Sequence, residues 1–312
     1  MSSGPGVGEL WRAMRHAEAR VGGGEGCEGV YGSITEAGTA RVLGALAGLG
    51  GGGDGGGGGR GEDALGPGSV VLDVGAGLGR PLLHAAVAMG CSGGLGVEVD
   101  PVKCAKADAF LRLTLARLAA RGDPGGVLAC LGAPERRPRI FCADMGELRT
   151  VEPATHVYSF WEGIPRSARA AVGALVRKSR SVRGVAVVQR AVRGGAAGAA
   201  GAAAEQEMAD LGFGDLRLEA SFPVTMSGSG RSFVAYVFAR SAPPPGTAAH
   251  FPPEAALDRL AAAAAAPGGA AAALGPRRRG RRRPAEAPPA ALRLGRAKRP
   301  RGLPPAAPAR KA

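Results

Sequence analysis

The regular alternation of short apolar runs with longer helical runs, beginning at Ser69, is the strongest constraint on how this chain folds. The strand-like runs are 70–74, 95–99, 139–143, 156–160 and 185–189, and the helix-like runs are 82–89, 102–121, 166–180 and 202–211. A strand, helix, strand rhythm of this kind is typical of a doubly wound, mainly parallel sheet with helices on both faces.

The last two strand-like runs, 216–222 and 233–238, follow one another without a helix between them. Parallel neighbours need a long crossover connection, so these two runs are expected to form an antiparallel hairpin that closes the sheet. The sequence therefore predicts an α/β fold with a mainly parallel seven-stranded sheet and a C-terminal antiparallel hairpin. A hairpin at this end separates the predicted fold from a dinucleotide-binding domain.

Composition divides the chain into four parts. Residues 1–49 are predicted to form a helical arm, with a helix over 8–21 and a Val-Tyr-Gly segment at 30–32. Residues 50–68 are too rich in glycine to bury apolar surface and are expected to form a flexible loop. Residues 69–240 form the predicted folded domain, and the Ala, Pro and Arg-rich residues 241–312 are expected to be a largely disordered tail. With eight Phe, three Tyr and two Trp in 312 residues, one modest core is expected and not two.

The positive charge is concentrated in the tail. The formal net charge is +14, and residues 277–311 hold most of it because Glu286 is their only acid. Blocks such as Arg277–Arg283 suit the neutralisation of phosphate groups and resemble nuclear-import signals, which predicts DNA binding and a nuclear location. The competing interpretation is a compositional bias toward Arg, Pro and Ala, under which these blocks are filler.

Cysteine and histidine show no metal-ligand spacing. The four His are dispersed, as are the five cysteines Cys27, Cys91, Cys104, Cys130 and Cys142, which favours reduced thiols in an intracellular compartment and no bound metal. The longest apolar run, 260–274, is interrupted by Pro267, Gly268 and Gly269, so no membrane segment is predicted. Glu9 and Glu18 argue against a transit peptide.

The first strand-like run ends in Asp-Val-Gly-Ala-Gly-Leu-Gly at 73–79 and passes directly into a helix. Glycines at this point let the backbone turn tightly and approach a ligand at the helix N-terminus. A dinucleotide fingerprint would need Gly or Ala where Arg80 stands, so the G-x-G-x-G spacing instead resembles the S-adenosylmethionine loop of class I methyltransferases. The predicted cofactor-binding residues of this loop are Asp73, Gly75, Gly77 and Gly79.

Two further strand ends carry acidic residues. Glu98 ends the second strand-like run, where a carboxylate can accept hydrogen bonds from both ribose hydroxyls. Asp144 follows the third run, where it offers an acceptor for the adenine amino group. Three acids in this order are more specific than a glycine-rich loop alone, and they predict S-adenosylmethionine as the cofactor. The competing interpretation is chance glycines with carboxylates that merely cap helices.

Four segments carry a more particular resemblance. They are Val-Tyr-Gly-Ser at 30–33, the loop at 72–79 with Gly-Val-Glu at 96–98, Val-Tyr-Ser-Phe-Trp-Glu-Gly at 157–163, and Gly-Ser-Gly-Arg at 228–231. Together they resemble the disruptor-of-telomeric-silencing type of nucleosomal histone H3 lysine methyltransferase. The resemblance covers about residues 28–240. It implies a class I methyltransferase fold, methylation of a histone H3 lysine in nucleosomes, and contact with nucleosomal DNA through a basic stretch.

The sequence departs from this family in three places. The family has a pair of Asn where this chain has Tyr158 and Ser159, and Gln where it has Arg80. The helical N-terminal lobe is reduced to some 30 residues. These departures concern the acceptor lysine rather than the cofactor.

The predicted catalytic residues are Tyr158, Ser159 and Tyr31. A lysine with its reference pKa of about 10.4 is protonated at neutral pH, so a channel that removes water from the amine and lowers this pKa enables the reaction. Phe160 and Trp161 are further candidates to line such a channel, and they fit equally well as core aromatics.

Two other functions compete with this hypothesis. The first is an RNA base methyltransferase on the same fold, although the fourth strand-like run lacks the Asn/Asp-Pro-Pro-aromatic turn common in enzymes that modify a base nitrogen. The second is a non-catalytic chromatin-binding protein that keeps the fold and uses the tail. The intact set of Asp73, Glu98 and Asp144 argues against loss of the cofactor.

Overall fold

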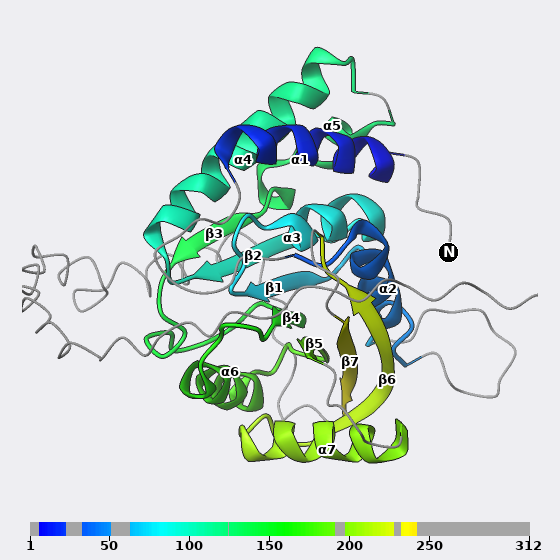
Figure 1. Ribbon diagram of the computed structural model, residues 1–312, viewed down its shortest axis with the longest axis vertical. Helices are drawn as coiled ribbons and strands as arrows, with labels where there is room; N and C mark the ends of the chain where they lie inside the picture. The colour runs from blue at the N-terminus through cyan, green and yellow to red at the C-terminus, as the bar shows by residue number, and fades with distance from the viewer. Residues whose placement is uncertain are drawn as a thin grey trace, which may run out of the picture. The chain divides into compact units, whose positions relative to one another are not determined.

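The computed structural model describes residues 6–22, 33–50, 63–123, 125–190, 197–227 and 232–241, which form a seven-stranded sheet with helices on both faces (Figure 1). The strands are β1 (Val70–Val74), β2 (Gly93–Glu98), β3 (Arg139–Cys142), β4 (His156–Phe160), β5 (Gly184–Arg190), β6 (Leu216–Thr225) and β7 (Ser232–Arg240). Their order is β3-β2-β1-β4-β5-β7-β6. Strands β1 to β5 pair in parallel, and β7 runs antiparallel to both β5 and β6. This confirms the predicted fold class, the C-terminal hairpin included.

The helices are α1 (Val7–Val21), α2 (Glu36–Leu46), α3 (Arg80–His84), α4 (Pro101–Ala120), α5 (Val127–Cys130), α6 (Arg166–Lys178) and α7 (Ala197–Asp210), with a π-helical turn at Ala85–Met89 and a 3-10 turn at Pro134–Arg136. The expected helices at 8–21, 102–121, 166–180 and 202–211 correspond to α1, α4, α6 and α7. Helix α2 was not predicted. Its signal in the sequence is Thr35, whose hydroxyl accepts a hydrogen bond from the amide of Gly38 at 3.2 Å and caps the helix.

The sheet is buried on both faces, as a parallel sheet requires. Leu72 and Val74 of β1 point to the face covered by α6 and α7, where the rings of Trp161 and Phe213 lie 6.4 Å apart. Val71, which precedes Leu72, points to the opposite face, which α2 and α3 cover. The strand period of two residues therefore sends neighbouring side chains into two separate apolar clusters.

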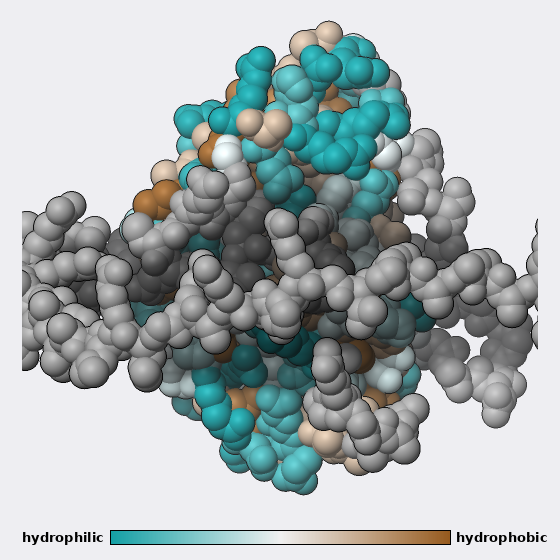
Figure 2. Space-filling model, in the orientation of Figure 1, coloured by the Kyte–Doolittle hydropathy of each residue, from teal (hydrophilic) through white to brown (hydrophobic). Residues whose placement is uncertain are grey.

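Helix α1 packs on α4 (Figure 1), and a third cluster forms mainly between helices, with Leu10, Met14, Phe110 and Leu118 among its buried residues. The outward faces of the helices are mostly hydrophilic in the view of Figure 2. Within the described residues, no helix is long and apolar enough to cross a membrane.

The strand order places the point where the winding reverses at β1. Strands β2 and β3 lie on one side of β1, and β4 and β5 lie on the other. In open α/β sheets, ligands bind outside the carboxyl ends of the strands at such a point. The predictions for residues 242–312, for most of the glycine-rich loop at 50–68 and for Tyr31 concern residues outside the described ranges, so they stay predictions.

Candidate functional site

A cavity of about 310 Å³ opens where the winding reverses. This volume is at the lower end of the range of about 300 to 1,000 Å³ that small-molecule sites occupy. Six of the predicted site residues line it: Asp73, Gly75, Gly77, Glu98, Asp144 and Tyr158. The cavity thus brings together the ends of β1, β2 and β4 and the segment after β3, which the sequence analysis singled out separately.

The glycine loop has the conformation for which glycine is needed. Gly75 and Gly77 have φ angles of 74° and 52°, in the left-handed region that residues with a Cβ rarely adopt. The amides of Gly75 and Ala76 donate to the carbonyl of Val97 at 2.8 Å and 3.1 Å, which holds the loop against β2. Gly79 is not among the lining residues and instead precedes the first residue of α3.

The loop rests on Gly96 of β2, a residue to which the sequence analysis gave no role of its own. A Cβ at Gly96 would lie 2.7 Å from the Cβ of Ala76 and 2.4 Å from the Cδ1 of Ile140. Real Cβ atoms do not approach one another so closely. The absence of a side chain at Gly96 therefore allows the loop to lie flat on the strand.

Glu98 joins the loop to the end of β2. One carboxylate oxygen accepts from the amide of Gly77 and the other from the amide of Asp100, both at 3.0 Å. The residue is only 5% exposed, yet its side chain lines the cavity. Each carboxylate oxygen has a second acceptor site, so Glu98 retains the capacity to accept two further hydrogen bonds from a ligand.

Beyond the ends of β2 and β3, the cavity is bordered by one acidic and one apolar side chain. Asp144 is exposed and accepts from the amide of Gly146 at 2.7 Å. Val99, which follows Glu98 directly, is 57% exposed although it is apolar. A flat ligand group such as a purine could pack on Val99 while its polar edge reaches Asp144. The sequence analysis missed Val99, whose signal is an apolar residue between two acids.

Asp73 and Tyr158 are paired neighbours in β1 and β4, and both are buried. Burial, followed by the charge of Glu98, raises the pKa of Asp73 to about 8. Burial also raises the pKa of Tyr158, and the charge of Asp73 adds to this effect. At neutral pH both groups are therefore mainly protonated and can donate hydrogen bonds into the cavity.

The raised pKa of Asp73 predicts a pH dependence of stability. Between about pH 4 and pH 8 the carboxyl of Asp73 keeps a proton in the folded chain and releases it in the unfolded chain. The contribution of Asp73 to stability is therefore complete below about pH 4 and is lost as the pH rises through 8. Asp73→Asn mimics the neutral form at every pH. In urea unfolding without cofactor, we expect the variant to gain stability relative to the native chain as the pH rises through this window. Parallel profiles of unfolding free energy against pH for the two chains would contradict the raised pKa of Asp73.

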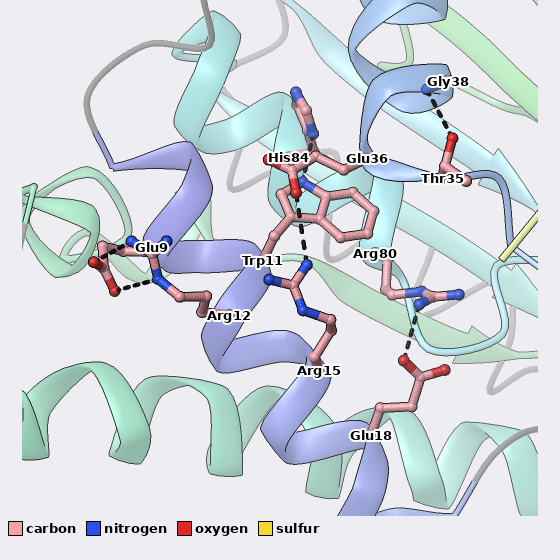
Figure 3. A network of polar contacts seen from close by, with 10 residues as sticks. All are labelled: Glu9, Trp11, Arg12, Arg15, Glu18, Thr35, Glu36, Gly38, Arg80 and His84. Atoms are coloured by element: carbon pink, nitrogen blue, oxygen red, sulfur yellow. Dashed lines mark hydrogen bonds and ion pairs between the residues drawn. The ribbon is translucent and has the colours of Figure 1, made fainter.

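Arg80 forms part of the cavity wall and is held by the N-terminal helix. Its guanidinium donates to the carboxylate of Glu18 at 2.9 Å and lies 5.9 Å from the ring of Trp11. The indole of Trp11 donates in turn to Nδ1 of His84 at 2.9 Å. Figure 3 shows these α1 side chains directed at α3. The sequence analysis noted Arg80 only as a departure from a motif, because nothing in the sequence connects it to Glu18.

The predicted catalytic residues are placed differently from one another. Tyr158 lines the cavity together with Phe160. Ser159 points to the opposite face of the sheet, where its hydroxyl donates to the carbonyl of Val74 at 3.1 Å, and it does not line the cavity. Trp161 lies in the core cluster under α6, with the guanidinium of Arg169 4.8 Å from its ring, which fits its interpretation as a core aromatic.

Within the described residues, no three His, Cys, Asp or Glu side chains come together as a metal site would require. The donor set of the cavity instead fits a nucleoside with a short charged chain. Glu98 suits the ribose, Asp144 and Val99 suit the base, and Asp73 and Arg80 suit the polar chain.

The chain was compared with known proteins. No protein-family model matches it, and no curated protein matches it. Among solved structures it is similar to a proposed RNA methyltransferase from Pyrococcus horikoshii, with 12% identity, 75% of this chain and 100% of that chain covered, and a TM-score of 0.45. It is also similar to precorrin-6y C5,15-methyltransferase from Geobacter metallireducens GS-15, with 13% identity, 65% and 87% covered, and a TM-score of 0.39. At such low identities and TM-scores, the function has to be inferred from the chain's own site.

Proposed function

We propose that this protein is an S-adenosylmethionine-dependent methyltransferase. The observation that carries the proposal is the convergence of the glycine loop, Glu98 and Asp144 on one cavity at the reversal point of the sheet.

The bound cofactor would supply a methyl group already activated on a sulfonium. The residues of the chain then have to hold the ligand, align the acceptor and exclude water. Glu98 and Asp144 would hold the adenosine end, and the loop at Gly75 and Gly77 would approach the charged chain. Tyr158 and Phe160 would border the space in which the acceptor meets the methyl group.

For the acceptor we propose a protein lysine, with histone H3 in nucleosomes as the first candidate. The support is the resemblance of four segments to the histone H3 lysine methyltransferases, together with the position of three of them in the cavity wall. Ser33, the last residue of the Val-Tyr-Gly-Ser segment, lines the cavity, as do Tyr158 and Phe160. A buried aromatic surface of this kind lowers the pKa of an amine and favours its neutral, nucleophilic form.

The test is a transfer assay with tritiated S-adenosylmethionine and the full chain, in which recombinant nucleosomes, free histones and RNA are supplied side by side. Label on histone H3 in nucleosomes supports the proposal. Label on RNA alone would support a base methyltransferase in its place. Cofactor binding without transfer to any of the three would leave the non-catalytic chromatin-binding hypothesis to be tested by nucleosome binding.

Tyr158→Phe tests whether this hydroxyl acts at the acceptor. Turnover is expected to fall about tenfold, which corresponds to about 1.4 kcal/mol of barrier, while the affinity for S-adenosyl-homocysteine stays unchanged. Tyr236→Phe is the matched control, because Tyr236 is also a buried tyrosine of the sheet but faces the other apolar cluster and does not line the cavity. If Tyr158→Phe lost turnover and cofactor affinity equally, the hydroxyl would not act at the acceptor.

We also propose that the basic tail binds DNA and that the protein acts in the nucleus. A chain that ends at Gly275 lacks the Arg blocks and is expected to bind S-adenosylmethionine as before. The logarithm of nucleosome affinity should fall linearly with the logarithm of salt concentration, with a slope of about −0.9 per phosphate neutralised, and truncation should flatten it. Filter binding at several salt concentrations measures both slopes. Identical slopes would identify the Arg blocks as compositional filler.

A further inference from the structure

We propose that Cys104 and Cys142 form an oxidisable thiol pair, which a hydroperoxide converts to a disulfide that weakens cofactor binding. The modification site itself stands on the geometry of the described residues. Its effect on the cofactor rests on the proposed function.

Both cysteines adjoin Glu98 at the end of β2. Cys104 lies in the first turn of α4, and its Sγ donates to the carbonyl of Glu98 at 3.4 Å. Cys142 is the last residue of β3 and is the partner of the same Glu98 in the β2–β3 register. The pKa of the Cys104 thiol also responds to Cys142, which places the two side chains near one another. A disulfide needs an S–S distance of about 2.05 Å, which two cysteines that adjoin the same residue can reach by a small movement.

An oxidant can reach both sulfurs. Cys142 is exposed, and half-buried Cys104 lines a second cavity of about 260 Å³ between α4 and β3. Leu78 is the one lining residue that this cavity shares with the cofactor cavity among the described residues. A small peroxide can therefore reach the pair while the cofactor site is occupied.

The two cysteines have different roles in the reaction. Burial, together with the contact to Cys142, raises the pKa of the Cys104 thiol, so the exposed Cys142 is expected to react first. Its sulfur takes the terminal oxygen of the hydroperoxide and becomes a sulfenic acid, and the hydroperoxide leaves as an alcohol or, from hydrogen peroxide, as water. The sulfur of Cys104 then attacks the sulfenic sulfur, the S–O bond breaks, and the hydroxyl leaves with the Cys104 proton as water. Two electrons pass from the thiol pair to the peroxide.

Both cysteines adjoin residues of the cofactor cavity. Lys103 precedes Cys104, Ala143 and Asp144 follow Cys142, and all three line the cavity. A disulfide would draw the N-terminal turn of α4 toward the end of β3 and shift these wall residues together. We expect the affinity for the cofactor to fall about tenfold, with recovery on reduction.

The experiment treats the reduced full chain with hydrogen peroxide. Digestion without reductant, followed by mass spectrometry, identifies the linked cysteines, and calorimetry with S-adenosyl-homocysteine measures affinity before oxidation, after it and after dithiothreitol. We expect a Cys104–Cys142 link and a reversible tenfold loss of affinity. Cys104→Ser and Cys142→Ser should lose both responses. Cys130→Ser, at another half-buried cysteine, is the control and should keep both.

A disulfide between other cysteines, or no disulfide, would overturn the proposal that Cys104 and Cys142 form an oxidisable pair. A Cys104–Cys142 link with unchanged affinity overturns its effect on the cofactor. If the reduced chain does not bind S-adenosyl-homocysteine, the proposed function and the affinity effect both fail, while the mass measurement still decides the pair.

Discussion

Glu98→Ala is expected to weaken binding of S-adenosyl-homocysteine about 100-fold. The variant removes the proposed acceptor for two ribose hydroxyls, and each hydrogen bond to a charged group is worth about 1.5 to 3 kcal/mol. It also leaves the amides of Gly77 and Asp100 without their carboxylate partner, which loosens the loop. Isothermal titration calorimetry, carried out well below the unfolding temperature of the variant, measures the loss.

Two comparisons make the Glu98 result specific. Glu147→Ala removes an exposed carboxylate close to the same cavity and should bind the ligand normally. Glu98→Gln should be intermediate, because the Gln oxygen can still accept from one amide while its NH₂ group meets the other amide donor-to-donor. Unchanged affinity in Glu98→Ala would mean that the ribose is held elsewhere.

Gly173→Ala is expected to destabilise the fold by about 3 kcal/mol, at the upper end of the cost of overpacking a core. A Cβ at Gly173 would lie 2.2 Å from the carbonyl oxygen of Leu211 and 2.8 Å from the Cδ2 of Phe213. A backbone oxygen cannot swing aside as the end of a long side chain can, so α6 has to move away from the segment after α7. For a fold of this size, the midpoint of thermal unfolding should drop by roughly 10 °C.

The matched control is Gly8→Ala in α1, where the nearest atom to the new Cβ is the flexible end of Arg12 at 3.9 Å. Alanine favours a helix over glycine by up to about 1 kcal/mol, so this variant should be as stable as the native chain or slightly more so. Similar melting temperatures for the two variants would show that α6 does not pack on Leu211 as described.

The elements that the sequence predicted are those with strong local signals. The β-branched run at 70–74 followed by a glycine loop can form little else than a buried strand and a tight turn, and the missing helix between β6 and β7 requires an antiparallel pair. Helix α2 was missed because its glycines and threonine have weak helical propensity. What stabilises it is burial of Val42, Leu43 and Leu46 against the sheet, which is a tertiary effect.

The site was predictable to the extent that its residues lie at strand ends. Asp73 and Glu98 lie at the carboxyl ends of their strands and Asp144 lies just after one. These strand ends share one edge of the sheet, so the meeting of the three acids follows from the topology. The strand period was not applied to Tyr158 and Ser159, although neighbours in a strand face opposite sides of the sheet. Of these two residues, Tyr158 lines the cavity and Ser159 does not. The Glu18–Arg80 pair could not be predicted, because it depends on the docking of α1.

The position of β7 has a consequence for the order in which the protein can be completed during synthesis. It is the last strand of the described residues, yet it lies inside the sheet, between β5 and β6. Until residue 240 has left the ribosome, β5 presents an open edge and β6 has no strand that joins it to the sheet. Exposed edges of this kind pair readily with other chains. The sheet of the nascent protein can therefore close only after β7 has been synthesised. Chains that stop before β7 are expected to aggregate rather than to fold as smaller domains.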